Sequence, residues 1–340
     1  MNTRLLSTLL STSLSAVLWQ IPHLAWSQKP PHNPTLTVIG YHEIINTENA
    51  LIPEYAVSTT QFQQHIDWLK KNGFHFINVD QLIQAHQGKY SLPTKPVLLT
   101  VDDGYASFYQ NAYPIVKANK IPVVLAVVGS WLEPKEDQSI DFSGEQIQRN
   151  QMLFWAELKE MQDSGLVEMA SHSYNLHRGI VGNPQGNLEP AAVTRLYDPK
   201  SASYEDDSHY QQRISNDFKQ NNQLLIAHGL KSPRIMVWPY GHYNMQTVKI
   251  AKQLGMPVAI SLDDGADSAK SSLGQLNRIL IEGNMTTADL AQEIQNRQQH
   301  LGDNNRPQKI MHIDLDYIYD KDPIQQERNL DHLLDRIVAM

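Results

Sequence analysis

The sequence predicts an α/β fold, namely a distorted (β/α) barrel of about seven strands. Short apolar runs alternate along the chain with segments of helical periodicity, an order typical of a parallel sheet covered by helices. Several of these runs are rich in Val, Ile and Leu, as strands buried on both faces are. Polar side chains collect where the runs end, and barrels of this class carry their chemistry at the carboxyl ends of the strands.

Each strand is predicted from an apolar run that is bounded by turn residues. The clearest runs are V-L-L-T-V at 97–101 and P-V-V-L-A-V-V at 122–128, and the run at 234–238 is closed by Pro-Tyr-Gly. The predicted strands are 35–41, 74–79, 97–101, 122–128, 167–171, 234–238, 257–262 and a further short one at 277–281.

Each helix is predicted from apolar residues that recur every three or four positions. In the segment 59–71, Phe62, Ile66 and Leu69 share one face, and Gly73 follows the predicted end. The stretch 179–207 breaks the alternation and is predicted to be a long polar loop that acts as a lid or rim. The predicted helices are 59–71, 80–85, 107–119 (despite Pro114), 155–164, 208–228, 244–254 and 287–295.

The first 27 residues are predicted to be a signal peptide that is excluded from the fold. Arg4 supplies the positive charge, 5–18 is an apolar run too short to span a bilayer, and A-W-S at 25–27 resembles a cleavage site. We therefore expect an exported protein that is periplasmic, outer-membrane-associated or secreted. The chain has no cysteine, so disulfides, thiolate metal sites and a lipid anchor on cysteine are not expected.

The end of the chain has its own organisation. After a proline-rich lead-in at 30–34, the barrel domain is predicted at 35–300 and a linker at 301–309. A strand pattern at 310–319 and a helix pattern from 324 onward then indicate the start of a second, truncated α/β domain at 310–340. The alternative is a C-terminal extension that packs on the barrel.

The composition narrows the class of ligand. The 340 residues carry a formal net charge of −8, which argues against a nucleic-acid-binding protein and suits a neutral or cationic ligand. The hydrophobic content of 41% is enough for a sizeable core. The loops carry no clustered Lys or Arg, which disfavours a nuclease or phosphatase.

Two adjacent carboxylates end the strand predicted at 97–101. Successive strand residues point to opposite faces, so Asp102 and Asp103 share one site only if the strand stops there. Gly104 permits the bend that brings both side chains to the rim. The alternative is an ordinary Asp-Asp-Gly turn.

Two histidines follow the strand predicted at 167–171. His172 stands at the end of that strand, and His177 lies five residues further on. Two imidazoles and one carboxylate with open positions match the arrangement that binds Zn²⁺ or another divalent first-row ion. The alternative is that each histidine is an ordinary polar residue with its hydrogen bonds satisfied.

Three motifs resemble those of the NodB-homology polysaccharide deacetylases. T-V-D-D at 100–103 resembles their first motif, H-S-Y-N-L-H at 172–177 their second with the second histidine one position later, and W-P-Y-G at 238–241 their third, without its usual arginine. G-Y-H-E at 40–43, D-D-G-Y-A-S-F-Y at 102–109, N-P-Q-G-N-L-E-P-A-A at 183–192 and M-H-I-D-L-D-Y-I-Y-D at 311–320 resemble the poly-β-1,6-N-acetylglucosamine N-deacetylases of the PgaB type. In that type a glycoside-hydrolase-like domain follows the deacetylase domain.

The resemblance implies a role for each matching residue. Asp103, His172 and His177 would hold one divalent metal, Zn²⁺ or else Ni, Co or Fe. Asp102 would be the general base, and it would lack the arginine partner that the third motif usually supplies. His42 would be the general acid, as the first-strand histidine is in the PgaB type. The backbone N–H of Tyr240 would help to stabilise the oxyanion.

Other polar and aromatic residues at the predicted strand ends are candidates for substrate contact. Trp238, Tyr240, Tyr174 and Tyr105 are predicted to stack on sugar faces, with core packing as the alternative for each ring. Asp263, together with Asp264, is predicted to contact substrate or orient His42, and an ordinary turn is the alternative.

The predicted function is metal-dependent N-deacetylation of exported poly-β-1,6-N-acetylglucosamine, a biofilm exopolysaccharide. The expected partners are that polymer and an outer-membrane export porin, and no nucleic acid is expected. The alternatives are a deacetylase of peptidoglycan or chitin oligosaccharides, and a non-catalytic glycan-binding or export scaffold.

Overall fold

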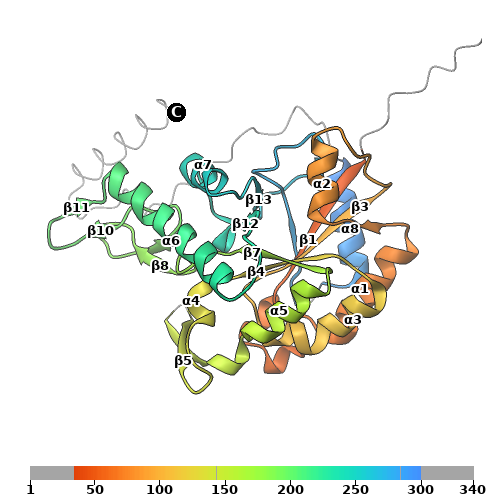
Figure 1. The fold of residues 1–340 in the computed structure, drawn as a ribbon, viewed down its shortest axis with the longest axis horizontal. Helices are drawn as coiled ribbons and strands as arrows, with labels where there is room; N and C mark the ends of the chain where they lie inside the picture. Colours follow the sequence, from red (N-terminus) through yellow and green to blue (C-terminus); the bar gives the residue numbers. More distant parts are fainter. Residues whose placement is uncertain (1–33, 143, 284, 300–340) are drawn as a thin grey trace, which may run out of the picture. The chain divides into compact units, whose positions relative to one another are not determined.

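A computed structural model of the protein describes residues 34–142, 144–283 and 285–299. The predicted signal peptide, linker and second domain therefore lie outside the described residues. The central sheet has the strand order β13-β12-β7-β4-β3-β1-β14, with β15 beside β1 and β2 beside β3 (Figure 1). Its strands are β1 (Thr35–Tyr41), β2 (His75–Phe76), β3 (Pro96–Val101), β4 (Val123–Val127), β7 (Val167–Ser171), β12 (Ile235–Val237), β13 (Val258–Ile260), β14 (Asp267–Ser268) and β15 (Ile279–Leu280).

The sheet curls into a distorted barrel, as predicted. All neighbouring strands pair in parallel except β1 and β14, which are antiparallel. The strands β13 and β1 do not pair with each other, and we call the gap between them the seam of the barrel. A short segment that begins at Leu276 lies in this seam. Leu276 N donates to Ala259 O at 2.9 Å, and Leu276 O accepts from Ser261 N at 2.9 Å. Three residues after Leu276, β15 begins and pairs with β1, so the seam is bridged by a single strand-like segment rather than by a full strand.

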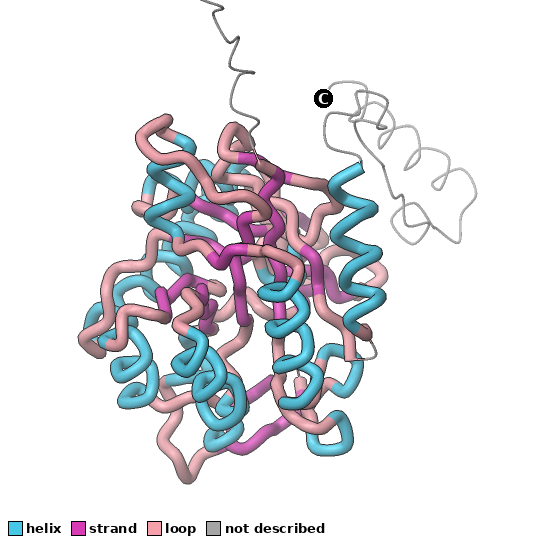
Figure 2. The backbone as a smooth tube through the Cα atoms, turned by 90° about the vertical axis from the view of Figure 1, so that its right-hand side faces the viewer, coloured by secondary structure: helices cyan, strands magenta, loops and turns pink. Residues whose placement is uncertain are grey.

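Helices surround the sheet, as the cyan segments around the magenta strands show in Figure 2. The helix α1 begins where Ser58 Oγ accepts from Gln61 N, and α2 begins with Asn78 in a capping box. The helices α1 and α8 lie side by side (Figure 1). The helices are α1 (Thr59–Lys71), α2 (Val79–His86), α3 (Tyr113–Asn119), α4 (Gly129–Leu132), α5 (Trp155–Asp163), α6 (Asp207–Ala227), α7 (Met245–Gln253) and α8 (Thr287–Gln299).

Strand alternation sorts the core into layers. In β3, Val97, Leu99 and Val101 join the apolar cluster that also contains residues of α1, whereas Leu98 joins a separate cluster with alternate residues of β1, β4, β12 and β13. The second cluster is the barrel interior. Because side chains alternate along a strand, Asp102 continues the interior face of Leu98 toward the carboxyl end of the barrel.

Several predicted elements are shorter or more divided than expected. The strand predicted at 74–79 forms a ladder over His75–Phe76 alone. The helix predicted at 107–119 is split into a π-helical turn, η3 (Phe108–Ala112), and α3. Pro114 explains the split, because proline lacks a backbone N–H and its ring clashes with the carbonyl four residues before it.

The stretch 179–207, predicted to be a long polar loop, is more ordered than expected. It contains two small hairpins, β8 (Gly179–Val181) with β9 (Leu188–Pro190) and β10 (Tyr197–Asp198) with β11 (Ser203–Tyr204). A third hairpin, β5 (Ser139–Phe142) with β6 (Glu145–Gln148), was not predicted. These ladders are two to four residues long, too short for a periodic signal in the sequence.

Among the described residues, no helix has the length and apolar character that a membrane span requires.

Candidate active site at the carboxyl ends of the strands

The chain turns sharply where β3 ends. Asp102 N donates to Tyr41 O at 2.9 Å, which continues the ladder with β1 for one more residue. Asp103 then has a φ of 73° and Gly104 a φ of 86°. A positive φ is uncommon for aspartate, and it redirects the second carboxylate so that both acids face one site. Asp102 and Asp103 are both buried.

The second carboxylate meets both histidines of the 172–177 segment. Asp103 Oδ1 lies 3.4 Å from His172 Nε2 and 3.5 Å from His177 Nε2. One ligand atom from each of the three residues lies within 4.8 Å of the others. Metal–ligand bonds of this kind measure about 2.0–2.2 Å, so two ligands of one ion lie roughly 3–4 Å apart. The distances from Asp103 Oδ1 to the two histidine nitrogens are in that range.

The donor chemistry of this cluster fits a divalent metal. His172 Nδ1 lies 2.7 Å from Val237 O and donates to it, which leaves the lone pair of Nε2 directed at the cluster. Asp103 Oδ1 is buried and has no hydrogen bond with any described residue. A buried oxygen without a donor is costly unless a cation satisfies it.

The pKa values of Asp103 and His177 favour the metal-binding forms, whereas the pKa of His172 is raised. Burial would lower the pKa of His172, but its contact with Asp103 and the charge of Asp102 outweigh burial. Burial lowers the pKa of His177 to about 4, against the opposing effect of Asp103, so its imidazole is neutral at pH 7. Burial alone would raise the pKa of Asp103, but His177, His172 and His42 outweigh it and hold that pKa below its usual range. The ring of His177 also packs against Trp131 and Tyr240, with centroids 5.1 and 4.3 Å away.

The helix α6 fixes the segment that carries the histidines. The two carboxylate oxygens of Asp217 accept from Tyr174 N and Asn175 N, each at 2.8 Å. Asn221, one turn further along α6, donates to Ser171 Oγ at 2.7 Å. The sequence pattern does not indicate these two residues, because polar positions on a long helix are normally solvated and only the tertiary structure buries them.

A buried arginine pairs with the first carboxylate. Arg278 Nη1 lies 2.8 Å from Oδ1 and 2.7 Å from Oδ2 of Asp102, and it also donates to Thr100 Oγ1 at 3.1 Å. The expectation that Asp102 lacks an arginine partner is therefore wrong. The arginine comes from the segment before β15, and its side chain passes Gly40 of the neighbouring strand β1, where a Cβ would lie 2.9 Å from Arg278 Cδ. Sequence spacing gave no signal for this pairing.

His42 completes the group of ionisable side chains. It follows β1, and its Nε2 lies 3.9 Å from Asp102 Oδ2. Burial lowers the pKa of His42, and the charge of Arg278 acts in the same direction, while Asp103 and Asp102 act against them. The ring of Tyr55 packs against His42, with centroids 5.5 Å apart and planes 34° apart.

The predicted substrate contacts divide into buried and exposed side chains. Trp238 and Tyr105 are buried, so neither ring presents a face to a glycan, which corrects the stacking prediction for both. Tyr174 is partly exposed and hydrogen-bonds to Glu133, and Tyr240 is exposed with a φ of 57°. Asp263 Oδ2 accepts a hydrogen bond from Tyr243 Oη at 2.6 Å, so the carboxylate is directed at Tyr243 rather than at His42.

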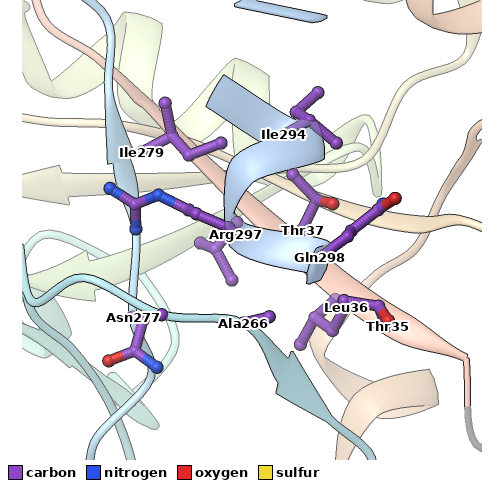
Figure 3. Close-up of a pocket in the computed structure, with 11 residues that line it drawn as sticks. Thr35, Leu36, Thr37, Ala266, Asn277, Ile279, Ile294, Arg297 and Gln298 are labelled. Carbon is purple, nitrogen blue, oxygen red and sulfur yellow. The ribbon is translucent and has the colours of Figure 1, made fainter. Parts of the chain in front are cut away.

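A separate small pocket lies at the seam of the sheet and is not part of this site. Figure 3 shows Arg297 of α8 with Asn277 and Ile279 on one side and Thr35, Leu36 and Thr37 of β1 on the other, while Ala266 lies next to Asn277. Its volume is about 10 Å³, which is no more than one water molecule requires. None of the residues that line it belongs to the Asp103 cluster or to the pair of Asp102 and Arg278.

A (β/α) barrel with an Asp-His-His cluster and an arginine-paired carboxylate at its strand ends has the arrangement of a hydrolase that uses a divalent metal. Comparison with known families gives the class more closely. The family model described as polysaccharide deacetylase matches residues 89–259. The chain belongs to the polysaccharide deacetylase family, whose members are hydrolases acting on amide bonds. A second model, described as hypothetical glycosyl hydrolase family 13, matches residues 312–340.

The relatives agree with this assignment. The chain is 37% identical over 310 residues to the poly-β-1,6-N-acetyl-D-glucosamine N-deacetylase of Escherichia coli K12, covering 91% of this chain and 45% of that protein. It thus spans about half the length of the curated relatives it matches first. A de-N-acetylase structure from Aggregatibacter actinomycetemcomitans superposes with a TM-score of 0.71 at 35% identity, covering 76% of this chain and 99% of that one. The BpsB deacetylase domain from Bordetella bronchiseptica gives 0.68 at 36% identity, covering 74% and 98%.

Proposed function

We propose that the protein removes acetyl groups from poly-β-1,6-N-acetylglucosamine. The observation that carries the proposal is the single buried group in which Asp103, His172 and His177 meet beside Asp102. The choice of polymer is supported by the names of the relatives that match nearly the whole chain. Amide hydrolysis needs a base for the attacking water, a sink for the oxyanion charge and a proton for the departing amine. This group, together with His42, contains a candidate for each.

Asp102 is the general base in this proposal. A buried carboxylate needs a charge partner, and Arg278 supplies it. His42 Nε2 lies 3.9 Å from Asp102 Oδ2. The arginine also fixes the direction of the carboxylate, because one guanidinium nitrogen contacts both oxygens. The base is therefore held in one orientation before substrate arrives, which is the condition for efficient proton abstraction.

Asp103, His172 and His177 hold the divalent metal in this proposal, with Zn²⁺ as the first candidate and Ni, Co or Fe as the others. When bound, the ion would polarise the substrate carbonyl and lower the pKa of water toward ~7. The chain's own contribution is to orient the three donors. The carbonyl of Val237 sets the tautomer of His172, and Asp217 holds the segment between the two histidines.

His42 is the general acid and protonates the departing amine nitrogen. Because burial lowers its pKa, a proton on this imidazole is given up more readily than one on an exposed histidine. The backbone N–H of Tyr240 is assigned to the oxyanion, on the carboxyl side of β12 and beside His177. The product carries free amines and is cationic, which suits a chain with a net charge of −8.

We further propose that the protein is exported and meets its polymer in the periplasm, at the outer membrane or outside the cell. The charged, apolar and small-residue pattern of residues 1–27 supports export. An outer-membrane export porin is the proposed protein partner, because a polymer that is modified after synthesis must still cross that membrane.

The experiment is acetate release from defined β-1,6-linked and β-1,4-linked N-acetylglucosamine pentamers, by the wild type and by Asp102→Asn. The proposal predicts metal-dependent acetate release from the β-1,6 pentamer, and a loss of about 10²–10⁴-fold in kcat for the variant. Preference for the β-1,4 pentamer would instead indicate chitin or peptidoglycan as substrate. Binding without acetate release by the metal-loaded wild type would indicate a glycan-binding scaffold.

A further inference from the structure

We propose that Tyr55 forms a sugar-binding subsite next to His42, where its ring packs on the pyranose that neighbours the acetylated sugar being hydrolysed. The inference rests on the proposed function and deepens it, because it names a side chain that recognises the polymer rather than the acetamide. Tyr55 ends η2 (Pro53–Tyr55), far along the chain from the three motifs at the strand ends.

The position of Tyr55 distinguishes it from other surface tyrosines. Four tyrosines in the described part of the chain are exposed, namely Tyr55, Tyr90, Tyr204 and Tyr240. Two of them, Tyr55 and Tyr240, pack against histidines of the site, Tyr55 against His42 and Tyr240 against His177. A substrate amide held between the base and the acid brings the rest of its chain past these two rings.

The segment that carries Tyr55 is fixed to the barrel from one side by Glu43. This buried carboxylate accepts from Leu51 N at 2.6 Å through Oε2, and the backbone of Glu43 accepts from Val57 N at 2.9 Å. Ile45 N donates back to Val57 O at 2.8 Å. Both ends of the loop that contains Tyr55 are therefore tied to the residue that follows His42.

The same segment is fixed from the other side by Gly283. Its N–H donates to Glu54 O at 2.8 Å, and a Cβ at this position would lie 2.7 Å from the carbonyl oxygens of Pro53 and Ala56. Glycine is required for so close an approach of two backbones. The backbone that carries Tyr55 is thus held in place by hydrogen bonds on both sides. An aromatic ring on a fixed backbone loses little conformational entropy when a ligand packs on it.

The chemistry of the ring matches the substrate class. A pyranose presents a face of C–H groups, which packs on an aromatic face, and its hydroxyl groups remain at the edge where water or a phenol reaches them. Tyr55 is 37% exposed, so it offers ring surface to a ligand while His42 covers another part. A small acetyl ester that lacks a neighbouring sugar would not reach this ring.

The test compares kcat/KM for a β-1,6 N-acetylglucosamine pentamer with kcat/KM for 4-nitrophenyl acetate, in Tyr55→Leu, Tyr55→Phe and wild type. The matched control is Tyr90→Leu, because Tyr90 is 38% exposed and its hydroxyl accepts a hydrogen bond from Gln81 Nε2. We expect the ratio of pentamer to ester kcat/KM to fall about tenfold in Tyr55→Leu, mainly through KM, and to stay near wild type in Tyr55→Phe and Tyr90→Leu. Pentamer Kd, measured in the Asp102→Asn background, should weaken by a similar factor when Tyr55→Leu is added.

Two results would overturn the subsite. The first is a Tyr55→Leu enzyme whose pentamer KM and Kd equal those of the wild type. The second is an equal loss on pentamer and ester, which would mean that the tyrosine acts by positioning His42. The proposed substrate itself would be overturned if the wild type hydrolysed the ester but released no acetate from the pentamer. This result is distinct from a failure of the subsite, because it is seen in the wild type without any variant.

Discussion

Arg278 Nη1 lies within 2.8 Å of both carboxylate oxygens of Asp102, and each of these two side chains is 1% exposed. The two residues are 176 positions apart in the chain. A buried ion pair of this kind tolerates the loss of both partners better than the loss of one, because a single remaining charge has no compensation. A substitution that breaks this pair should therefore lower the stability of the fold and also change the orientation of Asp102, the proposed base.

Arg278→Met should remove that compensation. We expect a loss of roughly 3–5 kcal/mol in the free energy of unfolding, together with a large fall in the kcat of acetate release. Adding Asp102→Asn to Arg278→Met should recover part of the stability and none of the activity. Urea denaturation of the two single variants and the double variant measures the coupling, and additive effects would show that the two side chains do not interact.

Gly40→Ala should disturb the same arginine without changing its charge. The new Cβ would lie 2.9 Å from Arg278 Cδ and 3.0 Å from its Nε, so the guanidinium must move away from Asp102. We expect a cost of about 1–3 kcal/mol in unfolding free energy and a fall in kcat. Gly274→Ala is the control, since its nearest neighbour would be Val248 Cγ1 at 3.3 Å. Equal kcat values for the two variants would contradict this account.

Asp217 should make stability depend on pH. Burial raises its pKa to about 6, although the N–H groups of Tyr174 and Asn175 act to lower it. The folded chain thus binds this proton more tightly than the unfolded chain, whose carboxyl has a pKa of about 3.9. The free energy of unfolding should fall as pH rises from about 4 to about 6, by an amount of order 3 kcal/mol, and then stay level.

The measurement is urea denaturation of the wild type and Asp217→Asn between pH 4 and pH 7. The stability of the wild type relative to the variant should decrease over this range, because the variant does not titrate at position 217. Two curves that run parallel through the whole range would show that Asp217 does not carry the shift.

Metal removal should destabilise the wild type more than a variant without the ligand set. Binding to the folded state alone adds RT ln(1 + [L]/Kd), about 2.7 kcal/mol at a hundredfold excess over Kd. We expect Zn²⁺ to raise the Tm of chelator-treated wild type and to leave that of Asp103→Ala nearly unchanged. A similar Tm rise in both proteins would mean that the ion binds elsewhere.

The fold was predictable because its signals are local. The apolar runs of β3, β4 and β7 and the one-faced pattern of α1 follow directly from strand and helix periodicity. The hairpins β8–β9 and β10–β11 were missed because ladders of two or three residues leave no periodic pattern. The division of the 107–119 helix depends on how one proline is accommodated, and a sequence pattern does not decide that.

The candidate site was predictable where strand ends mark it, and unpredictable where a long side chain reaches past a neighbouring strand. Asp102, Asp103 and His172 stand at strand ends, so the topology alone brings them to one rim. Arg278 reaches Asp102 past β1, from the segment that precedes β15, and nothing in its local sequence indicates that destination. Trp238 was expected at the rim but points into the core, because a strand end has an inward as well as an outward side.

The central claim is that one divalent ion binds between Asp103, His172 and His177. Anomalous diffraction from crystals grown with Zn²⁺, recorded above and below the metal absorption edge, tests it most directly. We predict a single anomalous peak about 2.0–2.2 Å from Asp103 Oδ1, His172 Nε2 and His177 Nε2. A structure at saturating Zn²⁺ with no peak among these three atoms, or with the peak coordinated by other residues, would contradict the account.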